Sequence, residues 1–351
     1  MFKPIYKLTN KIVAILTAIA ESKAIIERAK ILPQSEIKLR RQALIRMTHS
    51  STEIEGNILN LKQVEALAAH KKIDAPSRDI YEAENYFKAL KYIGQFVQKK
   101  QPIREKTLLK IHKLVTDKTL PKEQSGYYRR GPIFIVRRRM GLPDETVYAG
   151  PDAQDVPRLC FDLIKWLGES EEQNINPVIA AGILHQEIAA IHPFNDGNGR
   201  TARAMATLVL YQRGYDFRRL FALEDYYNRD RSKYYAAINV GKNYQERKTD
   251  ITSWLEYFVK GFKEEIDRVK AQVISLSFKK VAENLKSKIY LDQDQLKLLD
   301  FLDQVGRITI RDAVDILSCP KRTAQLKLRQ LKNMGVISQI GKGPSSAYIL
   351  K

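Results

Sequence analysis

Hydrophobic residues recur along most of this chain with the spacing of amphipathic helices. Between Leu8 and Arg28 they fall three or four positions apart, and no Gly or Pro interrupts them. That spacing places apolar side chains on one face of a helix. The same spacing predicts further helices at 36–52, 61–69, 77–99, 103–116, 157–167, 177–191, 201–211, within 223–240, and at 251–269. We therefore expect a mainly α-helical protein.

One segment departs from helical spacing. Residues 126–136 are rich in β-branched and aromatic side chains, and a basic run from Arg137 to Arg139, a Gly-Leu-Pro-Asp turn and a second short run at 146–148 follow. This composition on both sides of a turn predicts a β-hairpin, which we place at 133–147. The basic run is equally consistent with an ordinary solvated face.

The pattern restarts near residue 288 as a separate module. We expect a helix at 293–305, a short strand at 307–310, helices at 311–317 and 321–334, and strands at 336–340 and 347–350 around a turn at 341–344. This order is typical of a winged helix-turn-helix domain. In the last helix, Leu326, Leu331 and Met334 are predicted to face the core. Its outward face is expected to carry Lys321, Arg322, Gln325, Arg329 and Lys332.

Composition narrows the class of protein and of partner. A chain of 351 residues suggests two or three domains, and its formal net charge of +20 suits phosphates, nucleic acid or acidic protein surfaces. Cys160 and Cys319 fall in different predicted domains without metal-ligand spacing, which favours a reducing, cytoplasmic location. The apolar run at 12–20 is too short to span a bilayer and lacks a signal-peptide cleavage site, so we expect no membrane attachment.

Chemistry-bearing residues are concentrated between His192 and Arg203, in the stretch His-Pro-Phe-Asn-Asp-Gly-Asn-Gly-Arg-Thr-Ala-Arg. Pro193 disfavours helix at the residue before it, so the imidazole of His192 should stand on a bend. The glycines on either side of Asn198 let backbone N–H groups turn toward an anion, and a helix beginning just after them adds its positive end. A base next to an anion-binding loop is therefore predicted.

Charged side chains complete this predicted site. Asp196 offers an oxygen ligand, and Mg²⁺ bound to phosphates takes only one or two carboxylates from a protein. Arg200 and Arg203 lie three positions apart, on neighbouring faces of the first helical turn, where guanidinium groups can hold phosphate oxygens. Base, anion-binding loop, metal ligand and arginines together predict attack of a hydroxyl on a nucleotide phosphate.

This stretch resembles the signature of the Fic family, His-x-Phe-x-(Asp/Glu)-Gly-Asn-Gly-Arg-x-x-Arg, at all eight specified positions. The resemblance implies a protein adenylyltransferase (AMPylator) that moves AMP from ATP, with Mg²⁺ at Asp196, to a Ser, Thr or Tyr hydroxyl of a target protein or of the chain itself. It implies His192 as the catalytic base and Phe194 as packing. The implied nucleotide contacts are Asn195, Asp196, Gly197, Asn198, Gly199, Arg200 and Arg203.

A second motif, Ser51-Thr52-Glu53-Ile54-Glu55-Gly56, closes a predicted helix. Gly56 suits a left-handed helix end, whereas a carboxylate in the last turn opposes the helix dipole unless a cation meets it. The stretch resembles the inhibitory motif (Ser/Thr)-x-x-x-Glu-(Gly/Asn) of the Fic family through Ser51, Glu55 and Gly56. The resemblance implies that Glu55 pairs with Arg203 near the nucleotide and turns the α-phosphate of ATP away from the base.

The same resemblance gives the predicted hairpin and one tyrosine a role. The hairpin would be a flap on which a target segment docks by main-chain pairing, as an exposed strand edge allows. We assign this docking to Ile133, Phe134, Ile135 and Val136. Tyr234 is a candidate adenine contact. The family's asparagine would fall on Lys242, with Asn243 adjacent, so that contact stays open.

We therefore expect a helical Fic fold with a β-hairpin flap and a winged-helix domain. The parts are a helical region with the inhibitory motif at 1–100, a catalytic domain at 101–270 and the winged helix at 288–351. Two other functions stay open: removal of AMP by a water that Glu55 positions, and a DNA-binding regulator whose Fic domain senses nucleotide. The winged helix suits DNA or a protein, and a homodimer is a further candidate assembly.

Overall fold

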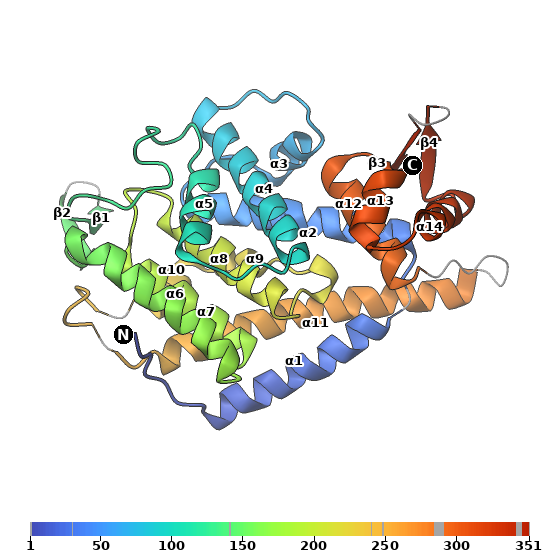
Figure 1. Ribbon diagram of the computed structural model, residues 1–351. Helices are drawn as coiled ribbons and strands as arrows, with labels where there is room; N and C mark the ends of the chain where they lie inside the picture. Colours follow the sequence, from blue (N-terminus) through green and yellow to red (C-terminus); the bar gives the residue numbers. More distant parts are fainter. Residues whose placement is uncertain are drawn as a thin grey trace. The chain divides into compact units, whose positions relative to one another are not determined.

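The computed structural model describes residues 2–29, 31–139, 142–239, 241–247, 249–283, 291–341 and 346–350. It is mainly helical, as predicted (Figure 1). The tip of the predicted hairpin at 140–141, most of the predicted turn at 341–344, and residues 288–290 lie outside the described residues. The chain divides into two compact units, Met1–Glu27 with Gln42–Lys270, and Arg28–Arg41 with Ala271–Lys351. Residues 42–100 thus belong to the same unit as the predicted catalytic domain.

The larger unit contains most of the helices. Their bounds are α1 (Asn10–Arg28), the second half of α2 (Pro33–Ile54), α3 (Leu61–Ala68), α4 (Ser77–Gln98), α5 (Glu105–Val115), α6 (Val156–Glu172), α7 (Pro177–Ile191), α8 (Asn198–Gln212), α9 (Leu223–Arg229), α10 (Arg231–Ile238) and the first part of α11 (Thr252–Glu283). Short 3₁₀ turns lie at Ala153–Asp155 and Phe217–Arg219.

Helix α7 lies at the centre of this unit. Almost all of its residues are buried, because its sequence is mostly apolar, and its buried carboxylate, Glu187, forms an ion pair with Arg247 (2.8 Å). It packs against α6 and α8, and α8 also packs against α4 and α5. Trp254 of α11 donates a hydrogen bond to the carbonyl of Gly182 (2.8 Å), where a Cβ would lie only 3.0 Å from Leu255. The buried helix therefore fixes the residue that follows its last turn, His192.

The segment 223–240 is two helices, α9 and α10, separated at Asp230. Asp230 is not helical, and its carboxylate accepts a hydrogen bond from the backbone N–H of Lys233 (3.0 Å) at the start of α10. The chain therefore changes direction here, because an Asp that caps a new helix ends the previous one.

A two-stranded antiparallel hairpin is present where the sequence predicted one. Strand β1 (Phe134–Arg139) pairs with β2 (Leu142–Ala149), with Phe134 opposite Ala149 and Ile135 opposite Tyr148. The second strand begins earlier than its short apolar run at 146–148. At its end, Ala149 exchanges backbone hydrogen bonds with Lys242 and Tyr244 (2.9 and 3.0 Å). The far edge of β2 is therefore partly covered.

The smaller unit contains α12 (Gln293–Val305), β3 (Ile308–Thr309), α13 (Ile310–Leu317), α14 (Lys321–Asn333), β4 (Ile337–Ile340) and β5 (Ala347–Leu350). Its strands form one antiparallel sheet in the order β3-β5-β4. The element order is the predicted one, while the winged-helix assignment stays a prediction. The expectation for Leu326 was wrong: it is 54% exposed, because α14 turns Ala324, Leu328 and Leu331 to the core.

Two features of the described residues concern membrane crossing and the state of the cysteines. No helix among them combines the length and the apolar character that crossing a bilayer requires. Cys160 is buried and Cys319 is partly buried, and both are free thiols. The cytoplasmic location stays a prediction.

Candidate active site

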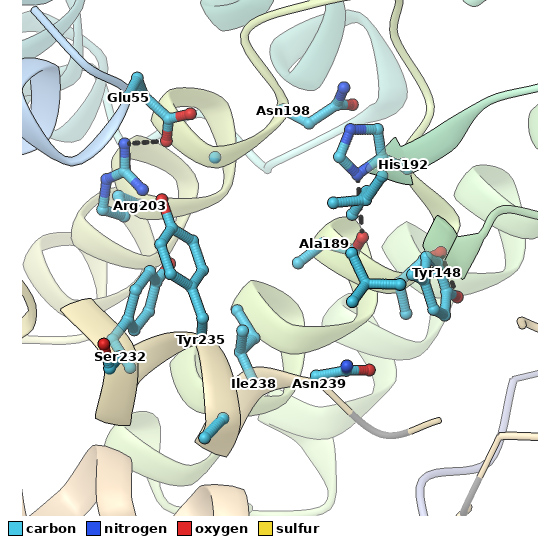
Figure 2. Close-up of a pocket in the computed structure, with 16 residues that line it drawn as sticks. Glu55, Tyr148, Ala189, His192, Asn198, Arg203, Ser232, Tyr235, Ile238 and Asn239 are labelled. Carbon is cyan, nitrogen blue, oxygen red and sulfur yellow. Dashed lines mark hydrogen bonds and ion pairs between the residues drawn. The ribbon is translucent and has the colours of Figure 1, made fainter. Parts of the chain in front are cut away.

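His192 stands on the predicted bend directly after α7. Its backbone is left-handed (φ 49°, ψ 59°), so the helix ends there and the ring turns into a cavity. Nδ1 lies 3.3 Å from the carbonyl oxygen of Ala189 (Figure 2). A carbonyl can only accept a hydrogen bond, so Nδ1 carries the proton and Nε2 keeps a free lone pair. Burial lowers the pKa of His192, so the ring is a neutral base near pH 7.

The loop after His192 is closed by the side chain of Asn198. Its amide donates to the carbonyl of Phe194 (2.8 Å) and accepts from the backbone N–H of the same residue (2.9 Å). Gly197 is left-handed (φ 76°), and a Cβ there would lie 2.7 Å from the side chain of Thr116. Helix α8 consequently begins at Asn198, three residues before the predicted start. The backbone of Gly199 thus belongs to the first turn, at the positive end of the helix.

A buried histidine of α5, His112, supports this loop, and nothing in the sequence pointed to it. The ring of His112 lies fully buried and stacks on Phe194, with 3.6 Å between the ring centroids and 2° between the planes. Its Nε2 is 3.0 Å from the carbonyl oxygen of Asp196, and its Nδ1 accepts from the backbone N–H of Gly126 (2.9 Å). The neutral tautomer is thereby fixed, and burial lowers the pKa of His112 to about 4.

Asp196 lies among charged side chains at the outer side of the loop. Its carboxylate contacts the guanidinium groups of Arg78 (2.9 Å) and Arg200 (3.2 Å), and both arginines also contact Glu82. Arg200 is only 1% exposed and lies beneath the loop, so its expected contact with phosphates stays a prediction. Among the described residues, no group of three or more His, Cys, Asp or Glu side chains could hold a metal ion.

The ion pair expected between Glu55 and Arg203 is present. Nη2 of Arg203 donates to Oε1 of Glu55 (2.7 Å) and to the backbone carbonyl of Ser51 (2.8 Å), and Nε donates to Oγ of Ser51 (2.9 Å). Gly56 is left-handed (φ 93°), as a helix end requires. A carboxylate at the end of a helix opposes the helix dipole unless a cation lies next to it, and at Glu55 that cation is Arg203.

The carboxylate of Glu55 lies directly on the backbone of the anion-binding loop. A Cβ built on Gly199 would lie 2.2 Å from Oε1 of Glu55 and 3.0 Å from Nη1 of Arg203. A negative group therefore already rests at the N-terminus of α8, where the sequence predicted phosphate. The inhibitory role of Glu55 stays a prediction.

Polar contacts hold the last turns of α2 to α9 and α10. Ser50 and Arg46 donate to Asp225 (2.6 Å each), and the hydroxyl of Tyr235 donates to the carbonyl of Ile54 (3.0 Å). Glu53 accepts from Asn228 (2.5 Å). The helix end that Glu55 directly follows is thus attached to the segment that forms one wall of the cavity.

The cavity between these elements has a volume of about 840 Å³. Figure 2 shows Glu55 and Arg203 across it from His192. Its lining residues are Glu55, Ile135, Val147, Tyr148, Ala189, Ala190, His192, Asn198, Gly199, Arg203, Ser232, Tyr234, Tyr235, Ala236, Ile238 and Asn239. The structure thus brings together the predicted base, the loop, the carboxylate of Glu55 and three hairpin residues, Ile135, Val147 and Tyr148, from distant parts of the sequence.

Several predicted site residues do not line this cavity. Asn195 is exposed and donates to Gln124 (3.0 Å), and Asp196 and Arg200 lie in the charged cluster described above. Ser51 contacts Arg203 from the last turn of α2, and Gly56 takes the left-handed conformation just after that helix. Of the four hairpin residues, Ile135 reaches the cavity, Ile133 and Phe134 do not, and the side chain of Val136 lies outside the described residues.

The two tyrosines of α10 differ in exposure. Tyr234 borders the cavity but is 2% exposed, because its hydroxyl contacts His185 (2.9 Å) and its ring stacks on Tyr227. Tyr235 is 47% exposed and was missed, since an adjacent pair gives no sequence signal for which ring faces out. The asparagine contact that the sequence left open has a candidate in Asn239, which lines the cavity.

The family comparison agrees with this geometry. Residues 102–210 match the Fic/DOC family. Protein adenylyltransferase Fic of Drosophila ananassae is 29% identical over 202 residues, which cover 57% of this chain and 36% of that protein. The protein of the same name from Nematostella vectensis is 27% identical over 191 residues, which cover 52% of this chain and 42% of that protein. The chain thus spans well under half the length of these curated relatives.

Solved structures show the same fold. A Fic family protein from Desulfovibrio desulfuricans superimposes with a TM-score of 0.63 at 24% identity, covering 100% of this chain and 98% of the other. A fragment of Fic-1 from C. elegans gives 0.60 at 21% identity, covering 75% and 73%. Residues 102–210 of this chain, with the signature His192 to Arg203 inside them, therefore match the Fic/DOC family, and the solved structures share its fold.

Proposed function

We propose that this chain is a protein adenylyltransferase, which transfers AMP from ATP to a Ser, Thr or Tyr hydroxyl of a target protein or of itself. The observation that carries the proposal is one cavity of about 840 Å³ that holds the free nitrogen of His192, the positive end of α8 and Arg203. Cavities of this volume accept ligands of nucleotide size. The names of the relatives support the same reaction.

In this reaction, His192 takes the proton of the acceptor hydroxyl at Nε2. The hydroxyl oxygen attacks the α-phosphorus of ATP and forms a bond with it. The bond from the α-phosphorus to the oxygen that bridges the α- and β-phosphates breaks, and pyrophosphate leaves. Nδ1 stays bonded to Ala189, which keeps the ring in one tautomer during the proton transfer. Because burial lowers the pKa of His192, the ring is neutral at neutral pH and its Nε2 can accept a proton.

Charge that develops on the phosphates meets the first turn of α8. The backbone N–H groups near Gly199 and the guanidinium of Arg203 border the cavity, and donors fixed before the reaction stabilise such charge most strongly. Mg²⁺ fits one side of this loop, since the carboxylate of Asp196 is partly exposed and one carboxylate suffices when phosphates supply further oxygens. There it would neutralise phosphate charge, in place of the contact that Arg78 now makes with Asp196.

Glu55 sets the resting state of this site. Its carboxylate accepts a hydrogen bond from Arg203 and lies next to the backbone of Gly199. The terminal phosphate of ATP therefore meets a negative group instead of a free guanidinium. Like charges at this separation repel, and the triphosphate shifts away from the position in line with His192. The chain therefore holds itself in an inhibited state until Glu55 leaves.

The hairpin presents the target. The described part of β1 pairs only with β2, and Phe134 is 57% exposed on it. An extended segment of a partner can add to such an edge through backbone hydrogen bonds, which accept many sequences. Ile135 reaches from the same strand into the cavity, so a segment docked there lies next to the nucleotide.

Labelled ATP tests this function. The Glu55→Gly chain is incubated with Mg²⁺ and ATP labelled either at the α- or at the γ-phosphate, alone and with a cell extract. We expect protein to acquire label from α-labelled ATP only, and mass spectrometry to show an added AMP group on a hydroxyl. Label from the γ-position would indicate a kinase, and no label from either would contradict the proposal.

A second activity is supported by α14 of the smaller unit, which we propose to bind DNA as the recognition helix of a winged-helix domain. Its outward residues are all exposed, as the sequence predicted: Lys321, Arg322, Gln325, Arg329 and Lys332. Such a basic face suits a major groove. Arg329→Ala should weaken binding and reduce its salt dependence, whereas Lys327→Ala is the matched control because Lys327 already pairs with Asp292 (2.6 Å). Binding without salt dependence would contradict this activity.

A further inference from the structure

Arg129 makes an unusual set of contacts beside the catalytic loop. It is 2% exposed, and its guanidinium donates hydrogen bonds to three backbone carbonyls: Nε to His192 (2.9 Å), Nη1 to Gly131 (2.7 Å) and Nη2 to Pro151 (2.6 Å). Its own backbone N–H donates to the carbonyl of Pro193 (2.9 Å). Among the described residues, this buried side chain hydrogen-bonds only to main-chain oxygens and forms no ion pair with an Asp or Glu, although a buried cation usually has such a partner.

These carbonyls belong to two parts of the site. His192 and Pro193 are the base and the residue after it. Gly131 lies just before β1 and Pro151 just after β2, so they flank the two stems of the hairpin. The stems are joined at the same level by the N–H of Gly150, which donates to Ile133 (3.1 Å). The guanidinium therefore connects the base with both ends of the hairpin.

The carbonyl of His192 needs such a donor. His192 is left-handed, a conformation that is unfavourable for a residue with a Cβ, and its carbonyl follows the last turn of α7, where no helical N–H remains to meet it. Three carbonyls in different directions require several donors in a fixed plane. Arginine supplies five donors in a rigid fork, and lysine has only one nitrogen to offer.

We propose that Arg129 is a positioning residue that holds the carbonyl of His192 in fixed register with both stems of the hairpin. The distance between a target segment docked on the hairpin and the ring of His192 then stays constant. The acceptor hydroxyl therefore lies within reach of Nε2. This inference rests on the proposed function, because it takes the hairpin as the place where the target docks.

The charge of Arg129 acts on the same ring. Burial is the largest cause that lowers the pKa of His192, and Arg129 lowers it further, whereas Glu55 from the turn after α2 and Asp196 from the loop raise it. Removing the guanidinium should therefore raise the pKa of His192. The acid limb of the rate profile would then move to higher pH, which a purely structural role would not cause.

The test compares Arg129→Met and Arg129→Lys with Arg130→Met, a matched control at the neighbouring exposed arginine. All three are made in the Glu55→Gly chain, and kcat and KM for AMP transfer, ATP affinity, and the rate profile against pH are measured. We expect Arg129→Met to lower kcat by up to about 10²-fold, since a misplacement of about 1 Å can cost that much. ATP affinity should hold, because Arg129 does not line the cavity. Arg129→Lys should not restore the rate, and added guanidinium ion should restore part of it to Arg129→Met.

Two results would overturn the inference. One is full activity of Arg129→Lys, and the other is a loss of kcat matched by an equal loss of ATP affinity with an unmoved pH profile. Hydrogen exchange gives a readout without catalysis: the amides of Ala149 and Gly150 should exchange faster in Arg129→Met and unchanged in Arg130→Met. If the chain transfers no AMP even with Arg129 intact, the proposed function fails, and this exchange alone decides whether the hairpin is held as inferred.

Discussion

The two sides of the cavity are held in different ways. On the side of the base, His192 and Asp196 each have a backbone carbonyl bonded to a buried side chain from elsewhere in the chain, Arg129 in one case and His112 in the other. Phe194 between them is fully buried against the ring of His112. The side of the cavity that carries His192 is therefore held by two buried side chains, Arg129 and His112.

On the opposite side, the carboxylate of Glu55 pairs with one guanidinium among the described residues, that of Arg203. The side chain of Glu55 is 29% exposed, and its carboxylate meets Arg203 at the end of a helix. Arg203 is buried, but Glu55 is partly exposed, so water can replace Arg203 as the partner of this carboxylate, whereas the buried carbonyls on the other side would be left without a donor. The comparison teaches that a group that must stay aimed is bonded from several directions, whereas a group that must leave has one partner.

Loss of the base should have the largest effect. His192→Ala removes the only group that the proposed reaction uses to take the proton, and general-base catalysis is worth about 10²- to 10⁴-fold. We expect AMP transfer in the Glu55→Gly chain to fall by that amount while ATP still binds, as α-labelled transfer and calorimetry would measure. His70→Ala, an exposed histidine, is the control. A rate unchanged by His192→Ala would show that the two sides do not differ as described.

Protonation of His112 should be the next largest effect. The unfolded chain binds a proton at this ring below about pH 6.5, whereas the folded chain binds it only near its lowered pKa of about 4. Stability from this group is therefore present above pH 6.5 and lost as the pH falls toward 4, by about 2 to 3 kcal/mol. Urea unfolding at pH 7 and pH 4.5 measures it.

A His112→Gln variant isolates this ring from the carboxylates that titrate in the same range. It should be less stable than the wild type at pH 7 and lose less stability on acidification. Equal pH dependence of the two free energies of unfolding would show that His112 does not titrate as its burial implies.

Release of the inhibitory side should raise the rate. Glu55→Gly frees Arg203 for phosphate, and coupling between two sites is typically worth 1–3 kcal/mol, or roughly 5- to 150-fold. Because Glu55 also raises the pKa of His192, the acid limb of the rate profile should move to lower pH. Glu53→Gly, the same change two residues earlier at a carboxylate that contacts Asn228, is the control. Equal acceleration by both would assign the effect to the helix end and not to the carboxylate.

The smallest change is expected from Ser51→Ala. The hydroxyl of Ser51 supports Arg203 at Nε, but the backbone carbonyl of Ser51 and Glu55 still hold Nη2. Loss of one hydrogen bond of about 1 kcal/mol should raise the transfer rate about fivefold. In the Glu55→Gly chain the same substitution should add nothing, because both changes release one guanidinium. Additive effects in the double variant would separate the two contacts.

The sequence predicted the parts of the site that are local. His192, the loop and the start of α8 lie within a dozen residues, so turn chemistry and helix signals place them, and the short motif around Glu55 placed its helix end. The helical pattern likewise predicted most of the fold. Leu326 was misplaced because two apolar faces of α14 fit the periodicity almost equally, and only packing in the core decides between them.

Contacts between distant segments were beyond this reasoning. His112 lies more than eighty positions from Asp196 and reads as one apolar-face histidine, and Arg129 reads as a basic residue before a strand. Their functions depend on which backbone carbonyls the fold brings beside them, and a carbonyl has no signature in sequence. The split between Tyr234 and Tyr235 depends in the same way on what lies opposite each ring.

The bare backbone at Gly199 limits how this protein can change over evolutionary time. The space that a side chain would fill there is where the Glu55 carboxylate now rests, and in the proposed reaction a phosphate needs the same space. A lineage under pressure to escape self-restraint cannot do so by enlarging this residue, because it would shut out its substrate as well. Escape has to begin at Glu55, directly after α2, where a smaller side chain removes the carboxylate and leaves the space above Gly199 open.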